Sequence, residues 1–195
     1  MKQEKQKHLI QYMKRFSIFV ATMMMASVMQ AAEKLDLKSI TSGAFSASYV
    51  TGINPIEGTD LYASISSDGK QVVSYSFKTG KQVAVLFDVE AAKAPMKSVE
   101  GYVMSPDGKK MLVFTKSKAV YRRSFKAEYF IYDIARKTIK KLSEGENQQV
   151  ATWSPDSRHI AFVKDNNIFV TDGEKEVQVT KDGKFNEVIN GIPDW

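Results

Sequence analysis

Short apolar runs alternate with polar turn sequences along most of the chain after Leu35. The apolar runs are rich in β-branched and aromatic residues, and Asp-Gly, Thr-Gly and Asn-Asn pairs separate them, which is typical of antiparallel strands joined by hairpins. Helical periodicity is almost absent. The pattern therefore predicts a mainly β fold, with strands at residues 62–66, 71–77, 82–87, 110–115, 129–134, 138–142, 150–154, 159–164, 168–171 and 177–180.

A polar turn motif recurs at intervals of about 40 to 50 residues, the length of a four-stranded propeller blade. It occupies residues 67–69, 105–108 and 154–157, and a basic residue and an apolar strand follow it each time. Proline favours a tight turn, and an aspartate side chain can accept hydrogen bonds from the backbone amides within it. We therefore interpret the motif as structural and not as a binding site.

The predicted fold class is all-β, a partial β-propeller of about three four-stranded blades over residues 33–195, with the first blade loosely defined. A closed propeller needs at least four blades, and the sequence ends at Trp195 without a closing strand. We therefore expect either a natural polypeptide that continues or a chain that completes itself by association. Open blade edges favour association, including homo-oligomerisation, in both cases.

The first 32 residues have the order of a secretory signal peptide. A basic stretch ends at Arg15, an apolar run covers residues 16–29, and the small residues Ala31 and Ala32 follow. This order predicts export to the periplasm or cell envelope. An uncleaved membrane anchor is the alternative, although the run is shorter than the roughly 20 residues that span a bilayer. The absence of cysteine removes disulfides and a thiol nucleophile, and it is compatible with export.

Composition and net charge limit the classes of molecule that the chain is expected to bind. The chain has 195 residues, 43% of them hydrophobic, and this is enough for one domain with a packed core. Its formal net charge is +6, but five basic residues and one acidic residue precede residue 33, so the remainder carries only about +2. An excess of that size is ordinary for a soluble surface. Nucleic acid is therefore not an expected partner.

None of the familiar catalytic constellations has the required spacing. There is no Gly-x-Ser-x-Gly elbow, and of the two histidines His8 lies in the predicted signal peptide and His159 at the start of a strand. Phosphate-loop, zinc and calcium motifs are also missing, so we expect no cofactor or metal. Glu144 and Glu146 lie in a polar turn and are interpreted as solvated. The sequence predicts that this chain alone is not an enzyme.

Several segments, taken in order, resemble the N-terminal propeller domain of the dipeptidyl peptidase IV family, bacterial branch. No single motif is decisive, but together the segments cover about residues 37–195. They are residues 40–45, 75–81, 86–88, 121–125, 128–134, 150–155 and 190–195.

The resemblance implies a serine exopeptidase that removes N-terminal dipeptides, preferably with proline or alanine second. Such an enzyme has an eight-bladed propeller and a C-terminal α/β-hydrolase domain, and peptide substrates are its partners. This chain would hold only the opening blades, and would end before the glutamate pair that binds the substrate amino group. A freestanding exported propeller-type module that binds proteins is the alternative function.

The family's arginine that hydrogen-bonds a substrate carbonyl matches Arg122. A guanidinium is always charged and has a planar fork of donors, so it can orient a peptide oxygen in a partly desolvated cavity. Without the resemblance, a solvated charge beside Arg123 would be the preferred interpretation. With it, Arg122 is the predicted substrate-binding residue, and no catalytic residue is predicted in this chain.

Overall fold

The computed structural model describes residues 13, 36–47, 52–120, 122, 124–145 and 147–192, and it divides the chain into two units at residues 49 and 50. In the first unit, helix α2 (Leu37–Thr41) begins with a capping box, in which the Asp36 carboxylate accepts a hydrogen bond of 2.6 Å from the Ser39 amide. The predicted signal peptide lies outside the described residues except for Met13. Within the described ranges no helix has the length and apolar character needed to cross a membrane.

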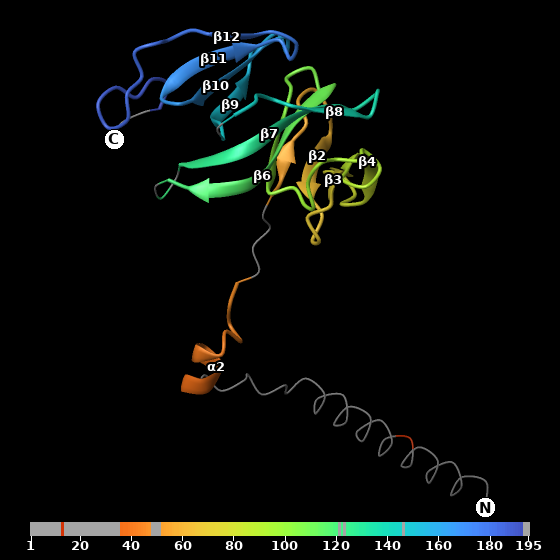
Figure 1. Ribbon diagram of the computed structural model, residues 1–195. Coiled ribbons are helices and arrows are strands. Elements are labelled where there is room, and N and C mark those ends of the chain that lie inside the picture. The colour runs from red at the N-terminus through yellow and green to blue at the C-terminus, as the bar shows by residue number, and fades with distance from the viewer. Residues whose placement is uncertain are drawn as a thin grey trace, which may run out of the picture. The chain divides into compact units, whose positions relative to one another are not determined.

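The second unit contains three four-stranded antiparallel sheets, each built from four strands consecutive in sequence (Figure 1). We call these sheets blades 1, 2 and 3. Blade 1 consists of β1 (Asn54–Pro55), β2 (Leu61–Ile65), β3 (Gln71–Ser76) and β4 (Gln82–Asp88). Blade 2 consists of β5 (Gly101–Met104), β6 (Lys110–Ala119), β7 (Phe125–Asp133) and β8 (Thr138–Lys141). Blade 3 consists of β9 (Gln149–Trp153), β10 (Ile160–Lys164), β11 (Asn167–Thr171) and β12 (Glu176–Gln178).

The predicted all-β partial propeller is confirmed, and every predicted strand is present. Blade 1, expected to be loosely defined, is a complete four-stranded sheet because β1 pairs with β2 through Asn54 and Pro55. Two strands, β1 with two residues and β5 with four, were not predicted. The β6–β7 hairpin is also longer than expected, because its outer part is largely polar.

The recurring turn has the structural role that the sequence predicts. In each copy the carboxylate of the aspartate accepts a hydrogen bond from the serine two residues before it and another from a backbone amide two residues after it. The serine in the first copy is Ser66 and not Ser67. The serine hydroxyl is the main cause of the lowered pKa of each of these aspartates. The serine-to-aspartate distances are 2.6 Å at Asp68, 2.7 Å at Asp107 and 2.5 Å at Asp156.

Blade 2 lies between two hydrophobic clusters. Successive side chains of a strand point to opposite faces of its sheet. Met111 and Val113 therefore pack with blade 1, where the Phe87 and Tyr132 rings meet edge to face at 4.8 Å, while Leu112 packs with blade 3. The interfaces between blades are thus apolar, and burial of this surface holds the three sheets together.

Candidate functional site

The predicted substrate-binding residue, Arg122, lies at the end of the β6–β7 hairpin. We call residues 118–120, 122 and 124–126 the arm; in it Lys118 pairs with Lys126, and Ala119 with Phe125. The arm is the outer end of the two long green ribbons of Figure 1. Arg122 is exposed in the loop, and no hydrogen bond or ion pair joins it to another described residue. Its neighbours at 121 and 123 lie outside the described residues, so the structure describes one arginine of the Arg122–Arg123 pair.

The loop that carries Arg122 is closed by a backbone hydrogen bond. The Val120 amide donates to the Ser124 carbonyl at 2.8 Å. The Ser124 hydroxyl is buried and has no hydrogen-bond partner among the described residues. The arm therefore keeps a paired backbone up to the loop, which limits the positions available to Arg122.

A β-bulge separates the arm from the body of blade 2. Thr115 pairs with Glu128, but the next pair is Lys118 with Lys126, so two residues of β6 oppose one residue of β7. Lys116, inside the bulge, has a positive φ of 53°. Such bulges bend a strand and change the direction in which it continues. The bulge therefore sets the direction of the arm.

At the bulge, β7 forms backbone hydrogen bonds with the segment that leads into blade 3. Ala127 and Gln148 exchange backbone hydrogen bonds of 2.9 and 3.0 Å, which form an isolated antiparallel bridge. The Tyr129 amide also donates to the Gln148 side-chain oxygen at 3.4 Å. The part of the hairpin next to the bulge is thus attached to the segment that leads into β9 as well as to its own sheet.

The free amides on the β6 side of the bulge are bound by Glu100, the residue before β5. The amides of Lys116 and Ser117 each donate to its carboxylate at 2.8 Å, and the Ser117 hydroxyl donates to it as well. The Ser117 hydroxyl is the largest cause of a Glu100 pKa below the usual range, and the two amides act in the same direction. Glu100 therefore replaces the backbone acceptors that the bulge removes from the ladder.

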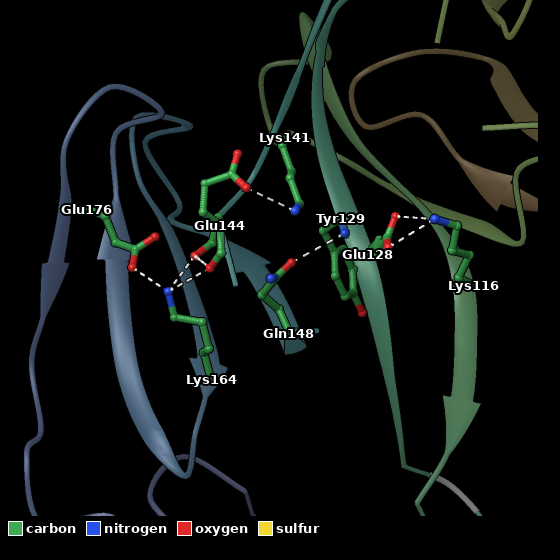
Figure 2. Close-up of polar contacts among 9 residues, drawn as sticks. Lys116, Glu128, Tyr129, Lys141, Glu144, Gln148, Lys164 and Glu176 are labelled. Carbon is green, nitrogen blue, oxygen red and sulfur yellow. Dashed lines mark hydrogen bonds and ion pairs between the residues drawn. The ribbon is translucent and has the colours of Figure 1, made fainter. Parts of the chain in front are cut away.

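Other polar contacts surround the inner end of the hairpin (Figure 2). The Lys116 ammonium lies 3.1 Å from the Glu128 carboxylate across the two strands. The Tyr129 side chain is buried, and this burial raises the pKa of its phenol to about 12. The Tyr129 phenol is therefore neutral at any physiological pH.

An aromatic row lies along the same part of the hairpin. The Phe114 ring lies 5.2 Å from that of Phe125 and 5.1 Å from that of Tyr129, measured between centroids. Gly101 faces this row, since a Cβ atom at that position would lie 2.1 Å from the Phe114 ring. The absence of a side chain at Gly101 is therefore required for the position of Phe114.

A cavity of about 400 Å³ lies between blades 1 and 2, beside Glu100. Gly101, Tyr102 and Phe114 line it from blade 2. On the blade 1 side, the Asn54 amide group donates to the Tyr102 hydroxyl at 2.9 Å. Burial raises the pKa of Tyr102, so its hydroxyl group is neutral. The cavity is therefore lined by a neutral hydroxyl group, an amide group and Glu100.

The Lys164 ammonium joins blade 3 to the loop between β8 and β9 (Figure 2). It lies 2.8 Å from the Glu176 carboxylate and donates to the Ser143 hydroxyl at 2.7 Å and the Glu144 carbonyl at 3.2 Å. It also lies 4.6 Å from the centroid of the Phe169 ring. Only 13% of the Lys164 side chain is exposed, so these contacts are largely shielded from water.

The remaining candidate residues of the sequence analysis lie apart from the hairpin. Glu144 has an exposed carboxylate, paired with Lys141 at 3.1 Å, while Glu146 lies outside the described residues. His159 is exposed at the start of blade 3's second strand. Within the part of the chain that the structure describes, no group of three potential metal ligands occurs. Sequence reasoning missed Glu100, because a single glutamate before a short strand matches no motif.

Comparison with known proteins identifies the family that this chain resembles. Residues 105–195 match the model for the dipeptidyl peptidase IV N-terminal region. The chain is 45% identical over 96 residues to a probable dipeptidyl-aminopeptidase B of Podospora anserina, an alignment that covers 47% of this chain and 10% of the relative. It is 34% identical over 167 residues to human prolyl endopeptidase FAP, covering 83% of this chain and 21% of that protein.

A solved structure shows the same architecture. The crystal structure of Porphyromonas gingivalis dipeptidyl peptidase 4 superposes with a TM-score of 0.75 at 40% sequence identity, over 84% of this chain and 24% of that one. The chain thus spans about a tenth to a fifth of the curated relatives and about a quarter of this structure. On the family match, the sequence identities and the shared fold, the chain belongs to the dipeptidyl peptidase IV family and corresponds to part of its N-terminal region.

Proposed function

We propose that this chain is a noncatalytic part of an exported dipeptidyl peptidase, and that Arg122 binds the peptide substrate. The observation that carries the proposal is the position of Arg122, which is exposed at the end of a paired hairpin in a chain of this family. Relatives bear the names dipeptidyl-aminopeptidase and dipeptidyl peptidase 4, so the substrates proposed are peptides with a free N-terminus. The products are N-terminal X-Pro or X-Ala dipeptides.

The geometry of the hairpin supports this role for Arg122. A guanidinium that is not paired with described residues keeps its donors available for an incoming carbonyl oxygen. The paired backbone on both sides of the loop reduces the conformational entropy that Arg122 loses when it binds substrate. Both features favour a role for Arg122 in binding and orienting the substrate. Neither feature gives Arg122 a part in cleavage of the peptide bond.

In this proposal the serine nucleophile and its base come from a hydrolase domain outside the residues of this chain. The propeller portion would admit the peptide and hold it while that domain cleaves it. The first 32 residues would direct the protein out of the cytoplasm, to the periplasm or cell envelope. The chain alone would then show no peptidase activity.

A chimeric enzyme tests the substrate role of Arg122. This chain would replace the matched segment of the Porphyromonas gingivalis enzyme, with which it shares 40% of its residues. Steady-state cleavage of Gly-Pro and Ala-Pro chromogenic amides would be compared between the parent chimera and its Arg122→Ala variant. Arg136→Ala is a matched control, because Arg136 is also exposed but pairs with Asp133 at 3.6 Å, in the turn after β7.

A lower kcat/KM in Arg122→Ala alone supports the proposal. An equal effect of both substitutions, or none in either, contradicts the substrate role of Arg122. The freestanding binding module is the competing function, and the gene sequence after the codon for Trp195 separates the two. An in-frame continuation that encodes an acidic pair agrees with the peptidase, whereas a stop codon favours the module.

A further inference from the structure

At Lys116 and Ser117 the β6 strand of the hairpin that carries Arg122 is held by a side chain in place of the ladder. Glu100 accepts both amides at 2.8 Å and the Ser117 hydroxyl. Its own amide donates to the Phe114 carbonyl at 2.9 Å, so the backbone of Glu100 is fixed to β6 on the body side of the bulge. One residue therefore connects the two segments that the bulge separates.

We propose that Glu100 is a positioning residue for Arg122, and that its carboxylate sets the direction of the arm by holding the bulge in one conformation. The role in substrate binding rests on the proposed function of Arg122. The other role of Glu100, to hold the bulge in one conformation, is the mechanical part of the proposal. It does not rest on the function of Arg122, because it concerns only the order of the arm. Glu100 has no contact with Arg122 among the described residues, so its effect is transmitted through the backbone of residues 116–120.

The other contacts at the bulge are weaker candidates for this role. Lys116 and Glu128 form an ion pair, but 63% of the Lys116 side chain is exposed, and exposed pairs contribute little to stability. The Ala127–Gln148 bridge holds the β7 side and leaves the β6 side free. Hydrogen bonds from backbone amides to a carboxylate are charge-assisted and short, so those of Glu100 dominate on β6.

The positive φ of Lys116 adds a second reason. A lysine is rarely found in this left-handed region, which costs conformational energy unless the surroundings stabilise it. The two amides bound by Glu100 are those of Lys116 itself and of the next residue. Without the carboxylate, the bulge would lose the contacts that favour this conformation, and the arm would sample other directions.

Amide hydrogen exchange of the full chain tests the mechanical part. The Val120 amide, bonded to the Ser124 carbonyl near the end of the arm, reports on the order of the arm. In Glu100→Ala we expect Val120 to exchange about tenfold faster or more, since local opening governs exchange. Leu112, in the body of blade 2, should exchange as in the parent chain.

Two further variants keep the test decisive. Glu100→Gln preserves size and one acceptor oxygen, so it should give an intermediate acceleration even if Glu100→Ala fails to fold. Glu90→Ala is the matched control, because the Glu90 carboxylate forms an ion pair with the exposed Lys70 on blade 1. If Lys116 and Ser117 exchange faster while Val120 does not, Glu100 is only a local cap and the proposal is overturned.

A double-mutant cycle in the chimeric enzyme tests the functional part. If Glu100 acts through Arg122, Glu100→Ala should lower kcat/KM about tenfold, mainly by raising KM, and should have no further effect in the Arg122→Ala background. Equal losses in both backgrounds would mean general destabilisation and would overturn the positioning role. If Arg122→Ala has no effect at all, the proposed function fails, and the exchange result still decides the role of Glu100 in ordering the arm.

Discussion

The Glu100 carboxylate accepts hydrogen bonds from both the backbone amide and the hydroxyl of Ser117, a residue 17 positions later in the chain. The amide bond is 2.8 Å long. Ser117 lies where the β6–β7 ladder is interrupted, so the side chain of the residue before β5 satisfies a donor that the sheet leaves free. This arrangement links the body of blade 2 to the arm that carries Arg122.

Replacement of Arg122 should affect catalysis and leave folding intact. In the chimeric enzyme, Arg122→Ala should lower kcat/KM by about 10- to 150-fold, the worth of a hydrogen bond to a charged group, about 1.5 to 3 kcal/mol. Arg122→Lys should restore only part of the loss, because an ammonium lacks the planar fork of donors. Steady-state kinetics and the melting temperature measure the two effects.

Arg123→Ala serves as the neighbouring control for that experiment and should have a smaller effect. A greater loss in Arg123→Ala would mean that the wrong arginine of the pair has been assigned. A lower melting temperature in Arg122→Ala with unchanged kinetics would show that the residue is structural.

A methyl group at residue 101 should disturb the aromatic row. In Gly101→Ala the new Cβ would lie 2.1 Å from the Phe114 ring, which must therefore move away from Phe125 and Tyr129. Overpacking of this kind costs about 1 to 3 kcal/mol. Urea denaturation should show the loss in the free energy of unfolding.

Phe114→Leu provides the control, because a smaller side chain at 114 leaves room for the new methyl group. The double variant should lose less stability than the sum of the single variants. Strict additivity would mean that the Gly101–Phe114 contact does not limit packing at this position.

The contacts of the shielded Lys164 ammonium should contribute more to the free energy of unfolding than those of an exposed ammonium. Lys164→Ala leaves the Glu176 carboxylate, the Ser143 hydroxyl and the Glu144 carbonyl without this partner, and we expect a loss of about 1 to 3 kcal/mol. Lys184→Ala is the matched control, since Lys184 forms an exposed pair with Glu187 at 2.6 Å and should cost less than about 1 kcal/mol. Equal losses in denaturant titrations would refute the distinction.

The three aspartates of the recurring turns should make the fold sensitive to acid. Hydrogen bonds from the neighbouring serines lower the pKa of Asp68, Asp107 and Asp156 in the folded state. Their stabilising effect is therefore present above the unfolded pKa of about 3.9 and is lost as the pH falls through the folded pKa. Melting temperatures measured from neutral pH downward should decrease in this range.

Asp107→Asn should reduce the steepness of that decrease, because one of the carboxylates that must be protonated is gone. Asp60→Asn, a substitution outside the recurring turns, is the control. An acid dependence unchanged by Asp107→Asn and altered by Asp60→Asn would contradict the assignment to the turns.

Features that depend on neighbouring residues could be predicted from the sequence. Except for β1 and β5, the strands of the three blades follow from short apolar runs between turn residues, and the turns at Asp107 and Asp156 follow from a serine and an aspartate two positions apart. In the first turn the same spacing selects Ser66, one residue before the predicted motif at residues 67–69. Arg122 falls between the predicted strands at residues 110–115 and 129–134 and lies between β6 and β7 in the structure, while its role in substrate binding stays a prediction.

The sequence by itself determined the strands other than β1 and β5, the recurring turns and the family resemblance, because these depend on residues close together in the chain. Only the tertiary structure decided the strand β5, the bulge at Lys116 and the role of Glu100. The Glu100 carboxylate binds amides 16 and 17 residues later in the chain, and the Trp153 indole donates a 3.1 Å hydrogen bond to the Val103 carbonyl across 50 residues. No local period encodes such contacts, since they form only when packing of the blades brings the segments together.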